Sequence, residues 1–184
     1  MSKKIEDFPV LETERLRLRM IEENDAPSLL KYLSDKDVMQ YYGLKPFTEI
    51  NEALNEISWY QSIYLNKSGI RWGITWKEEN EVIGSCGFLN GVSEHCRTDI
   101  GYELSKDYWG QGIASEALVA VLEYGFNELE LERVQALIEP PNISSMKLVE
   151  KHGFIREGLL RNYEYTDGKF DDLYMYALLK RDFK

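Results

Sequence analysis

The sequence predicts one domain of the α/β class, in which helices cover a mixed β-sheet. Three observations lead to this prediction. The chain has 184 residues, and 43% of them are hydrophobic, which is enough for one packed core. The middle of the chain alternates with the two-residue period of strands, and the later part changes to the 3.6-residue period of helices. No repeat and no linker rich in proline, glycine or serine divides the chain, so the domain is expected to span residues 1–184.

The N-terminal part is expected to contain one strand and two helices. Apolar residues alternate with arginines over residues 13–20, which predicts a half-buried strand. A helix capped by Asn24 or Asp25 should follow. A second helix is expected to begin at Thr48 and to run through Ile63.

Three strands are expected in quick succession after these helices. They cover residues 71–77, 81–89 and 98–104. Short polar stretches join them, as in hairpins, so this part of the sheet should be antiparallel.

The apolar period then becomes helical over residues 112–129. A short strand over residues 133–139 comes next and ends at two prolines. Asn142 is the expected cap of another helix, which Gly153 should terminate.

Two long strands are expected to close the chain, over residues 154–165 and 170–179. Asp167 and Gly168 lie between them and suit a two-residue hairpin turn. The order of elements, antiparallel strands followed by strand-helix-strand-helix, predicts a mixed sheet.

Composition narrows the class of partner. The chain carries 32 acidic and 22 basic residues, a formal net charge of -10, and no basic run. This argues against nucleic-acid binding and suits a cationic partner such as an amine, although many acidic proteins are acidic only for solubility. We expect no metal site, because Cys86 and Cys96 are the only cysteines and form no CxxC pair.

We predict neither a membrane-spanning segment nor a signal peptide for export. Residues 1–7 turn acidic where a signal peptide would be apolar. No apolar run approaches the ~20 residues that span a bilayer. The sequence therefore predicts a soluble, cytoplasmic protein.

The most informative stretch joins a predicted strand to a predicted helix through Gly110 and Gly112. Glycine lets the backbone approach a bulky anion, and the helix start offers unpaired N–H groups at the positive end of the helix dipole. Together these features predict a pyrophosphate site. No Walker lysine follows and no GxGxxG is present, which disfavours a P-loop and a dinucleotide-binding turn. An ordinary loop with two turn glycines is the alternative.

This stretch, followed by the Asn142 helix, closely resembles the GNAT superfamily of acetyltransferases. Trp109-Gly110-Gln111-Gly112-Ile113-Ala114 is similar to its pyrophosphate loop, with Trp109 where the superfamily usually has glutamine or arginine. The Tyr-Trp-Gly-Gln-Gly form resembles the RimJ/RimL branch, the ribosomal-protein N-terminal acetyltransferases. The opening residues 12–19, the helix region 142–154 and the closing hairpin support that branch.

The resemblance implies a central, mostly antiparallel sheet that is splayed between its middle strands and flanked by about four helices. It also implies acetyl-CoA as cosubstrate, without a metal. The residues implied to bind acetyl-CoA are Tyr102, Leu104, Trp109, Gly110, Gln111, Gly112, Ile113, Ala114 and Asn142. Tyr102 and Leu104 would act through the backbone of the splayed strand.

Direct transfer in a ternary complex, which the resemblance implies, needs few catalytic groups. Glu164 is the expected base, with Glu103 as its rival, and Ser145 is the expected donor to the leaving thiolate. The alternatives are a solvated strand carboxylate at position 164 and an ordinary first-turn serine at position 145. His152 is interpreted as structural.

The acceptor is expected to be a protein N-terminal α-amine, such as that of a ribosomal protein. A polyamine or a small-molecule amine is the alternative within enzymes, and a non-catalytic acetyl-CoA-binding module is the alternative of another class. A homodimer also stays open. Aromatic residues of the early helices either line the acceptor site or belong to the core and its rim: Tyr41, Tyr42, Trp59 and Tyr60.

Overall fold

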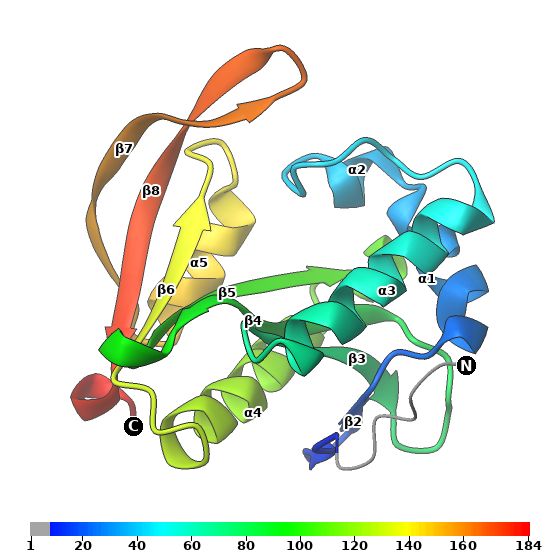
Figure 1. Ribbon diagram of the computed structural model, residues 1–184, viewed down its shortest axis with the longest axis horizontal. Coiled ribbons are helices and arrows are strands. Elements are labelled where there is room, and N and C mark those ends of the chain that lie inside the picture. The colour runs from blue at the N-terminus through cyan, green and yellow to red at the C-terminus, as the bar shows by residue number, and fades with distance from the viewer. Residues whose placement is uncertain (1–7) are drawn as a thin grey trace.

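One eight-stranded sheet, in the order β1-β2-β3-β4-β5-β6-β8-β7, organises the molecule (Figure 1). The structure is a computed structural model that describes residues 8–184. The segment over residues 1–7, for which we expect no signal peptide, lies outside the described residues. The strands are β1 (Leu11–Glu12), β2 (Leu16–Arg19), β3 (Ile70–Trp76), β4 (Gly84–Val92), β5 (Arg97–Leu104), β6 (Arg133–Ile138), β7 (Ile155–Thr166) and β8 (Lys169–Leu179).

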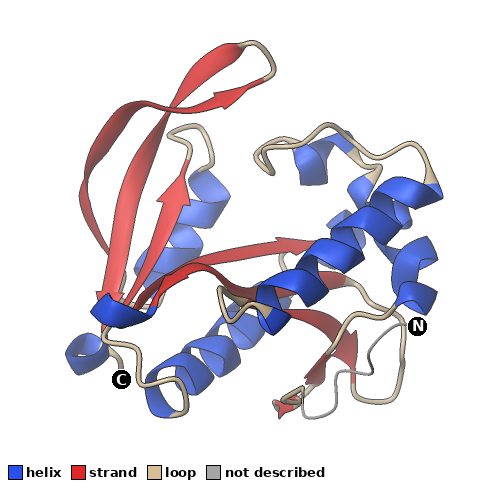
Figure 2. Ribbon diagram, in the orientation of Figure 1, coloured by secondary structure: helices blue, strands red, loops and turns tan. Residues whose placement is uncertain are grey.

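Helices cover both faces of the sheet (Figure 2). They are α1 (Ala26–Leu33), α2 (Lys36–Met39), α3 (Ile50–Leu65), α4 (Ile113–Asn127) and α5 (Ile143–Lys151). The larger core cluster packs α4 and α5 against the sheet, and a smaller one lies beneath α1 and α3. We call these the α4/α5 face and the α1/α3 face. The α/β prediction is therefore confirmed. Among residues 8–184, no helix is both long and apolar enough to cross a membrane.

The sheet opens between β5 and β6. Strands β2 to β5 are antiparallel neighbours, as expected. The β5–β6 pair is parallel and extends only from Arg97 with Arg133 to Asp99 with Gln135. Beyond Asp99 the two strands diverge (Figure 1). This confirms the splayed sheet that the family resemblance implies.

The helices and hairpin that follow the splayed strand form where the local sequence predicts them. The Asn142 side chain accepts a hydrogen bond from the Ser145 N–H and so caps α5, and Gly153, at φ +87°, ends it. Asp167 and Gly168 both have positive φ in the tight turn between β7 and β8.

The N-terminal part differs from the prediction in three ways. The strand expected over residues 13–20 begins only at Leu16, as β2, because Thr13 bonds back to Leu16 and forms a turn that separates β2 from the short β1 before it. The helix after Leu33 was not predicted, and its cap is Asp35. The cap of α3 is Glu49 rather than Thr48, because Glu49 and Glu52 form a reciprocal capping box.

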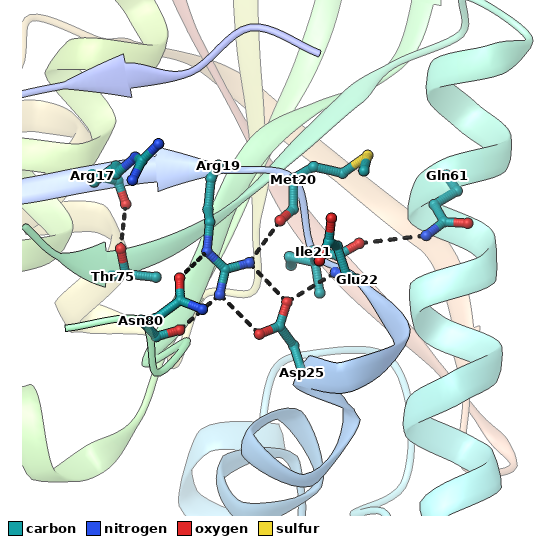
Figure 3. A network of polar contacts seen from close by, with 9 residues as sticks. All are labelled: Arg17, Arg19, Met20, Ile21, Glu22, Asp25, Gln61, Thr75 and Asn80. Carbon is teal, nitrogen blue, oxygen red and sulfur yellow. Dashed lines mark hydrogen bonds and ion pairs between the residues drawn. The ribbon is translucent and has the colours of Figure 1, made fainter. Parts of the chain in front are cut away.

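The start of α1 is a further correction, because neither Asn24 nor Asp25 caps it through its side chain. Asp25 instead accepts two hydrogen bonds of 2.8 Å from the Arg19 guanidinium, which also donates to Asn80 and to the Met20 carbonyl (Figure 3). The carboxylate also accepts the backbone N–H of Glu22, so its partners are the Arg19 guanidinium and the turn before α1 rather than the first N–H groups of α1. The network ties β2 to the start of α1 and to the loop before β4.

Replacing Arg19 with methionine is expected to lower the free energy of unfolding by roughly 2 kcal/mol, because charge-assisted hydrogen bonds contribute ~1.5–3 kcal/mol each and Asp25 would lose its cation. Urea unfolding measures this change. Arg17, exposed on the same strand, is the matched control, and Arg17→Met should change stability by less than ~0.5 kcal/mol. Equal losses in the two variants would contradict the assignment.

Candidate active site

The turn between β5 and α4 has the backbone geometry of an anion-binding loop. Gly110 and Gly112 have φ of +73° and +79°, in the left-handed region that other residues rarely adopt. A Cβ on Gly110 would meet nothing within 4 Å, and one on Gly112 would meet the Arg15 guanidinium at 3.5 Å. Space for a ligand therefore lies directly beside the backbone of this turn.

The first turn of α4 offers its donors to that space. Gly112 is the N-cap and has no side chain with which to cap the helix. The first N–H groups of a helix have no partner within it, and they stand at the positive end of its dipole. Ile113 is fully buried, so its side chain belongs to the core and does not contact a ligand. A pyrophosphate fits this donor set.

Trp109 holds the loop onto the end of β5. Its indole N–H donates to the Leu104 carbonyl over 2.8 Å, while 47% of the residue stays exposed. The tryptophan that stands where the superfamily usually has glutamine or arginine thus has a structural role here.

The opening between β5 and β6 presents backbone groups of the splayed strand. The Ser105 N–H donates to the Ile83 carbonyl. Going back along β5 from Ser105, every second residue directs its backbone N–H and C=O toward β4. This alternation turns the backbone of Glu103 toward β4 and that of Tyr102 and Leu104 toward the opening. Because Trp109 occupies the Leu104 carbonyl, the Leu104 N–H and the Tyr102 backbone are the groups directed at a ligand there.

Ser145 lies across the opening from Tyr102, on the α4/α5 face. The Ser145 Oγ is 2.5 Å from the Tyr102 hydroxyl, and the Ser145 N–H donates to Asn142. Burial raises the pKa of the Tyr102 phenol, so this hydroxyl stays protonated and can donate to Ser145. The Ser145 proton is then available to a third group.

Glu103 lies on the α1/α3 face and is bound inside a polar cluster. Arg71 forms an ion pair with it, and Ser85 and Tyr32 donate hydrogen bonds of 2.5 and 3.3 Å to its Oε1. Burial raises the pKa of the Glu103 carboxyl, while Arg71 acts in the opposite direction. Its oxygens are engaged by protein donors, which suits a structural role better than proton abstraction.

Glu164 has a different environment, at the far end of β7. It is exposed, and a Cβ on Gly43 would lie 3.7 Å from its Oε1. Beside it, Lys45 and Asp167 form an ion pair of 3.5 Å. The tip of the β7–β8 hairpin therefore contacts the loop between α2 and α3, on the side of the molecule where Figure 1 shows the two facing each other.

The aromatic residues of the early helices divide into two groups. The Tyr42 hydroxyl donates to Glu56 over 2.6 Å and lies 2.8 Å from the hydroxyl of buried Tyr60. Trp59 is 41% exposed and Tyr41 is half-buried. Tyr42 and Tyr60 thus extend the Arg71–Glu103 cluster toward the hairpin tip.

Sequence reasoning missed three contributors to the site. No local pattern indicates Arg71, because its partner Glu103 is 32 positions away. The Tyr102 hydroxyl was not predicted, because the family resemblance assigns a role only to the backbone of that strand. Arg15 contacts Gln111 and Glu116, and the alternating arginines of residues 12–19 were the available signal. His152 contacts Ser115 at 2.6 Å, from the last turn of α5 to the first turn of α4.

A splayed sheet beside a glycine-initiated, uncapped helix defines the class of acyl-CoA-binding transferases. The family described as the acetyltransferase (GNAT) domain matches residues 15–155. The chain therefore belongs to the GNAT family and is an acetyl-CoA-dependent N-acetyltransferase.

Known relatives agree with this family over nearly the whole chain. The uncharacterized N-acetyltransferase p20 of Bacillus licheniformis is 43% identical over 173 residues, which cover 94% of this chain and 97% of that protein. The ribosomal protein uS5-alanine N-acetyltransferase of Escherichia coli (strain K12) is 27% identical over 182 residues, covering 94% and 91%. A crystal structure of a GNAT-family acetyltransferase from Bacillus anthracis superposes with a TM-score of 0.83 at 30% identity, covering 94% and 99%.

Proposed function

We propose that this N-acetyltransferase acetylates the α-amine of a protein N-terminus. The observation that carries the proposal is Glu164, an exposed carboxylate where the β7–β8 hairpin tip contacts the Gly43 loop. Two surface segments that meet beside this carboxylate suit a chain end that enters lengthwise. The similarity to an enzyme that acts on the alanine of ribosomal protein uS5 supports the same class of acceptor.

The pKa values of the two amines and the available base favour an α-amine over a lysine side chain as the acceptor. An α-amine has a reference pKa near ~7.7–8.0, against ~10.4 for lysine, so far more of it is already neutral at pH 7. Of the two candidate bases, Glu164 is exposed, whereas its rival Glu103 is engaged by Arg71. A site in which one candidate base is left suits the amine that is easier to deprotonate.

The proposed mechanism is direct transfer between two substrates bound on opposite sides of the opening. Glu164 accepts the proton of the incoming ammonium, directly or through water, and the second proton that the nitrogen loses as the amide forms passes to water. The backbone of Tyr102 and Leu104 orients the acetyl carbonyl and the pantetheine arm, and the turn from Gly110 to Gly112 holds the pyrophosphate. On the other side, Ser145 donates a proton to the leaving sulfur, with the Tyr102 hydroxyl donating to Ser145 behind it.

A polyamine or small-amine acceptor is the second candidate, and a specific feature favours it. Burial raises the pKa of Glu139, which is half-buried just after β6. The carboxylates of Asp171 and Glu164 raise it further, while Lys169, ion-paired with Asp171, acts in the opposite direction. Three carboxylates with one lysine among them leave a net negative charge, which attracts a substrate with several positive charges. The same negative charge would also attract a protein N-terminus in which basic residues follow the α-amine.

Competition between two peptides of one sequence tests the acceptor. One peptide has a blocked N-terminus and a free lysine, and the other has a free N-terminus and an acetylated lysine. We expect the free-N-terminus peptide to be acetylated at least ~10-fold faster at pH 7, because more of its amine is neutral. Mass spectrometry of the mixed reaction measures the ratio, and release of free coenzyme A measures turnover.

Preferential acetylation of the free-lysine peptide, or of spermidine over both peptides, would replace the α-amine by the lysine or polyamine alternative. The absence of coenzyme A release with every amine would favour the non-catalytic module instead.

A further inference from the structure

The opening segment of the chain is bound to the first turn of α4, which lies about a hundred positions later in the sequence. The Thr13 hydroxyl and the Arg15 backbone N–H donate to Glu116 Oε1 over 2.5 and 2.9 Å. The Arg15 side chain donates to Glu116 Oε2 over 2.7 Å. Three donors from one turn therefore converge on a single carboxylate beside the glycine loop.

The Arg15 guanidinium also contacts the glycine loop directly. It donates to the Gln111 carbonyl over 3.1 Å and lies 3.5 Å from the position of a Cβ on Gly112. In a trans peptide the carbonyl and the following N–H point in opposite directions. Holding the Gln111 carbonyl toward Arg15 therefore directs the Gly112 N–H the other way, into the ligand space.

Glu116 needs this cation because of where it lies. A carboxylate in the first turn of α4 benefits from the helix dipole, but it also repels an anion bound at the same helix end. Burial acts to raise the pKa of Glu116, yet the hydrogen bonds from Thr13 and Arg15 outweigh it and lower that pKa. Glu116 is therefore charged at neutral pH, and Arg15 is the cation that balances it.

We propose that Arg15 is a positioning residue for acetyl-CoA, which orients the Gln111–Gly112 peptide toward the pyrophosphate and neutralises Glu116 beside it. The inference rests on acetyl-CoA binding at the Gly110–Gly112 turn. It gives a role to the first arginine of residues 12–19. Arg19 serves the network of Figure 3, and the Arg17 side chain is exposed.

The test replaces Arg15 with methionine, which keeps a similar length without charge or donors. The Kd for acetyl-CoA, measured by calorimetry, should rise about tenfold, a modest effect because Arg15 is partly exposed. The KM for acetyl-CoA should rise in parallel, while kcat at saturating acetyl-CoA stays within about twofold of wild type. A general structural defect would lower kcat as well.

Three further variants sharpen the result. Arg17→Met, on the exposed position of the same strand, should bind acetyl-CoA like wild type. Arg15→Lys keeps the charge but not the planar fork, so it should recover part of the affinity, and it replaces Arg15→Met if that variant does not fold. In a Glu116→Gln background, Arg15→Met should cost only about threefold or less, because the charge to be neutralised is gone.

Each outcome decides the proposal. If wild type binds acetyl-CoA and Arg15→Met binds equally well, the inference is wrong. If Arg15→Met costs the same in both backgrounds, Arg15 does not act by neutralising Glu116, which overturns that part of the inference. If wild type itself does not bind acetyl-CoA, the proposed pyrophosphate site fails instead.

Discussion

Replacing Gly112 with valine is expected to weaken acetyl-CoA binding by at least about a hundredfold. Valine is strained at a φ of +79°, and its branched side chain would press against the Arg15 guanidinium, so the turn that presents the helix donors would have to shift. Losing two charge-assisted hydrogen bonds to a phosphate removes at least ~3 kcal/mol, which is more than a factor of about a hundred in Kd. Calorimetry with acetyl-CoA measures the loss, and the rise in Tm that bound acetyl-CoA gives to wild type should disappear.

Gly168 provides the matched control. It has a φ of +83° at the hairpin turn, with nothing within 4 Å of an added Cβ. Gly168→Val should therefore suffer similar backbone strain and still bind acetyl-CoA. Wild-type affinity in Gly112→Val, or equal losses in both variants, would show that the turn does not hold the pyrophosphate.

Replacing Glu164 with glutamine is expected to lower kcat by ~10²–10⁴, the usual contribution of a general base. The Kd for acetyl-CoA should not change, because Glu164 lies at the hairpin tip and the pyrophosphate turn precedes α4. Activity of the variant should rise as pH approaches the pKa of the α-amine, near ~7.7–8.0, because the substrate then loses its proton without help. Initial rates across pH measure both effects.

Two carboxylates serve as comparisons for Glu164. Glu157, on the same strand and paired with Arg133, should tolerate glutamine without loss of kcat. Glu103→Gln should mainly lower Tm, because it leaves Arg71 buried without its counter-charge. Full activity in Glu164→Gln, together with a large kcat loss in folded Glu103→Gln, would reverse the two roles.

Signals within a few residues of each other predicted much of this molecule. The period of residues 112–129 gives α4, because its apolar face depends only on local spacing. Asn142 and Gly153 delimit α5 because capping and a left-handed C-terminal residue are local backbone requirements. Gly110 and Gly112 indicated the tight turn before α4 for the same reason, since a positive φ favours glycine in any fold.

Elsewhere, local sequence patterns predicted the structure wrongly, because side chains bind partners other than those that the local pattern indicates. Asp25 looks like a helix cap, but its carboxylate is bound by the Arg19 guanidinium and not by the first N–H groups of α1. Residues 13–20 alternate like one strand, but Thr13 and Arg15 turn toward Glu116, on a helix about a hundred positions away. Local periodicity carries no information about such partners.

The sequence by itself therefore determined the class of fold, the conformation of the glycine turn before α4 and the family, because these follow from short-range backbone preferences and from motifs. Only the tertiary structure decided how the two candidate carboxylates differ. Glu103 and Glu164 are both strand glutamates in the sequence, yet Arg71, Ser85 and Tyr32 enclose the first, while the second stays exposed beside Gly43. The environment of a carboxylate, and hence its chemistry, is set by residues that the fold brings from distant positions.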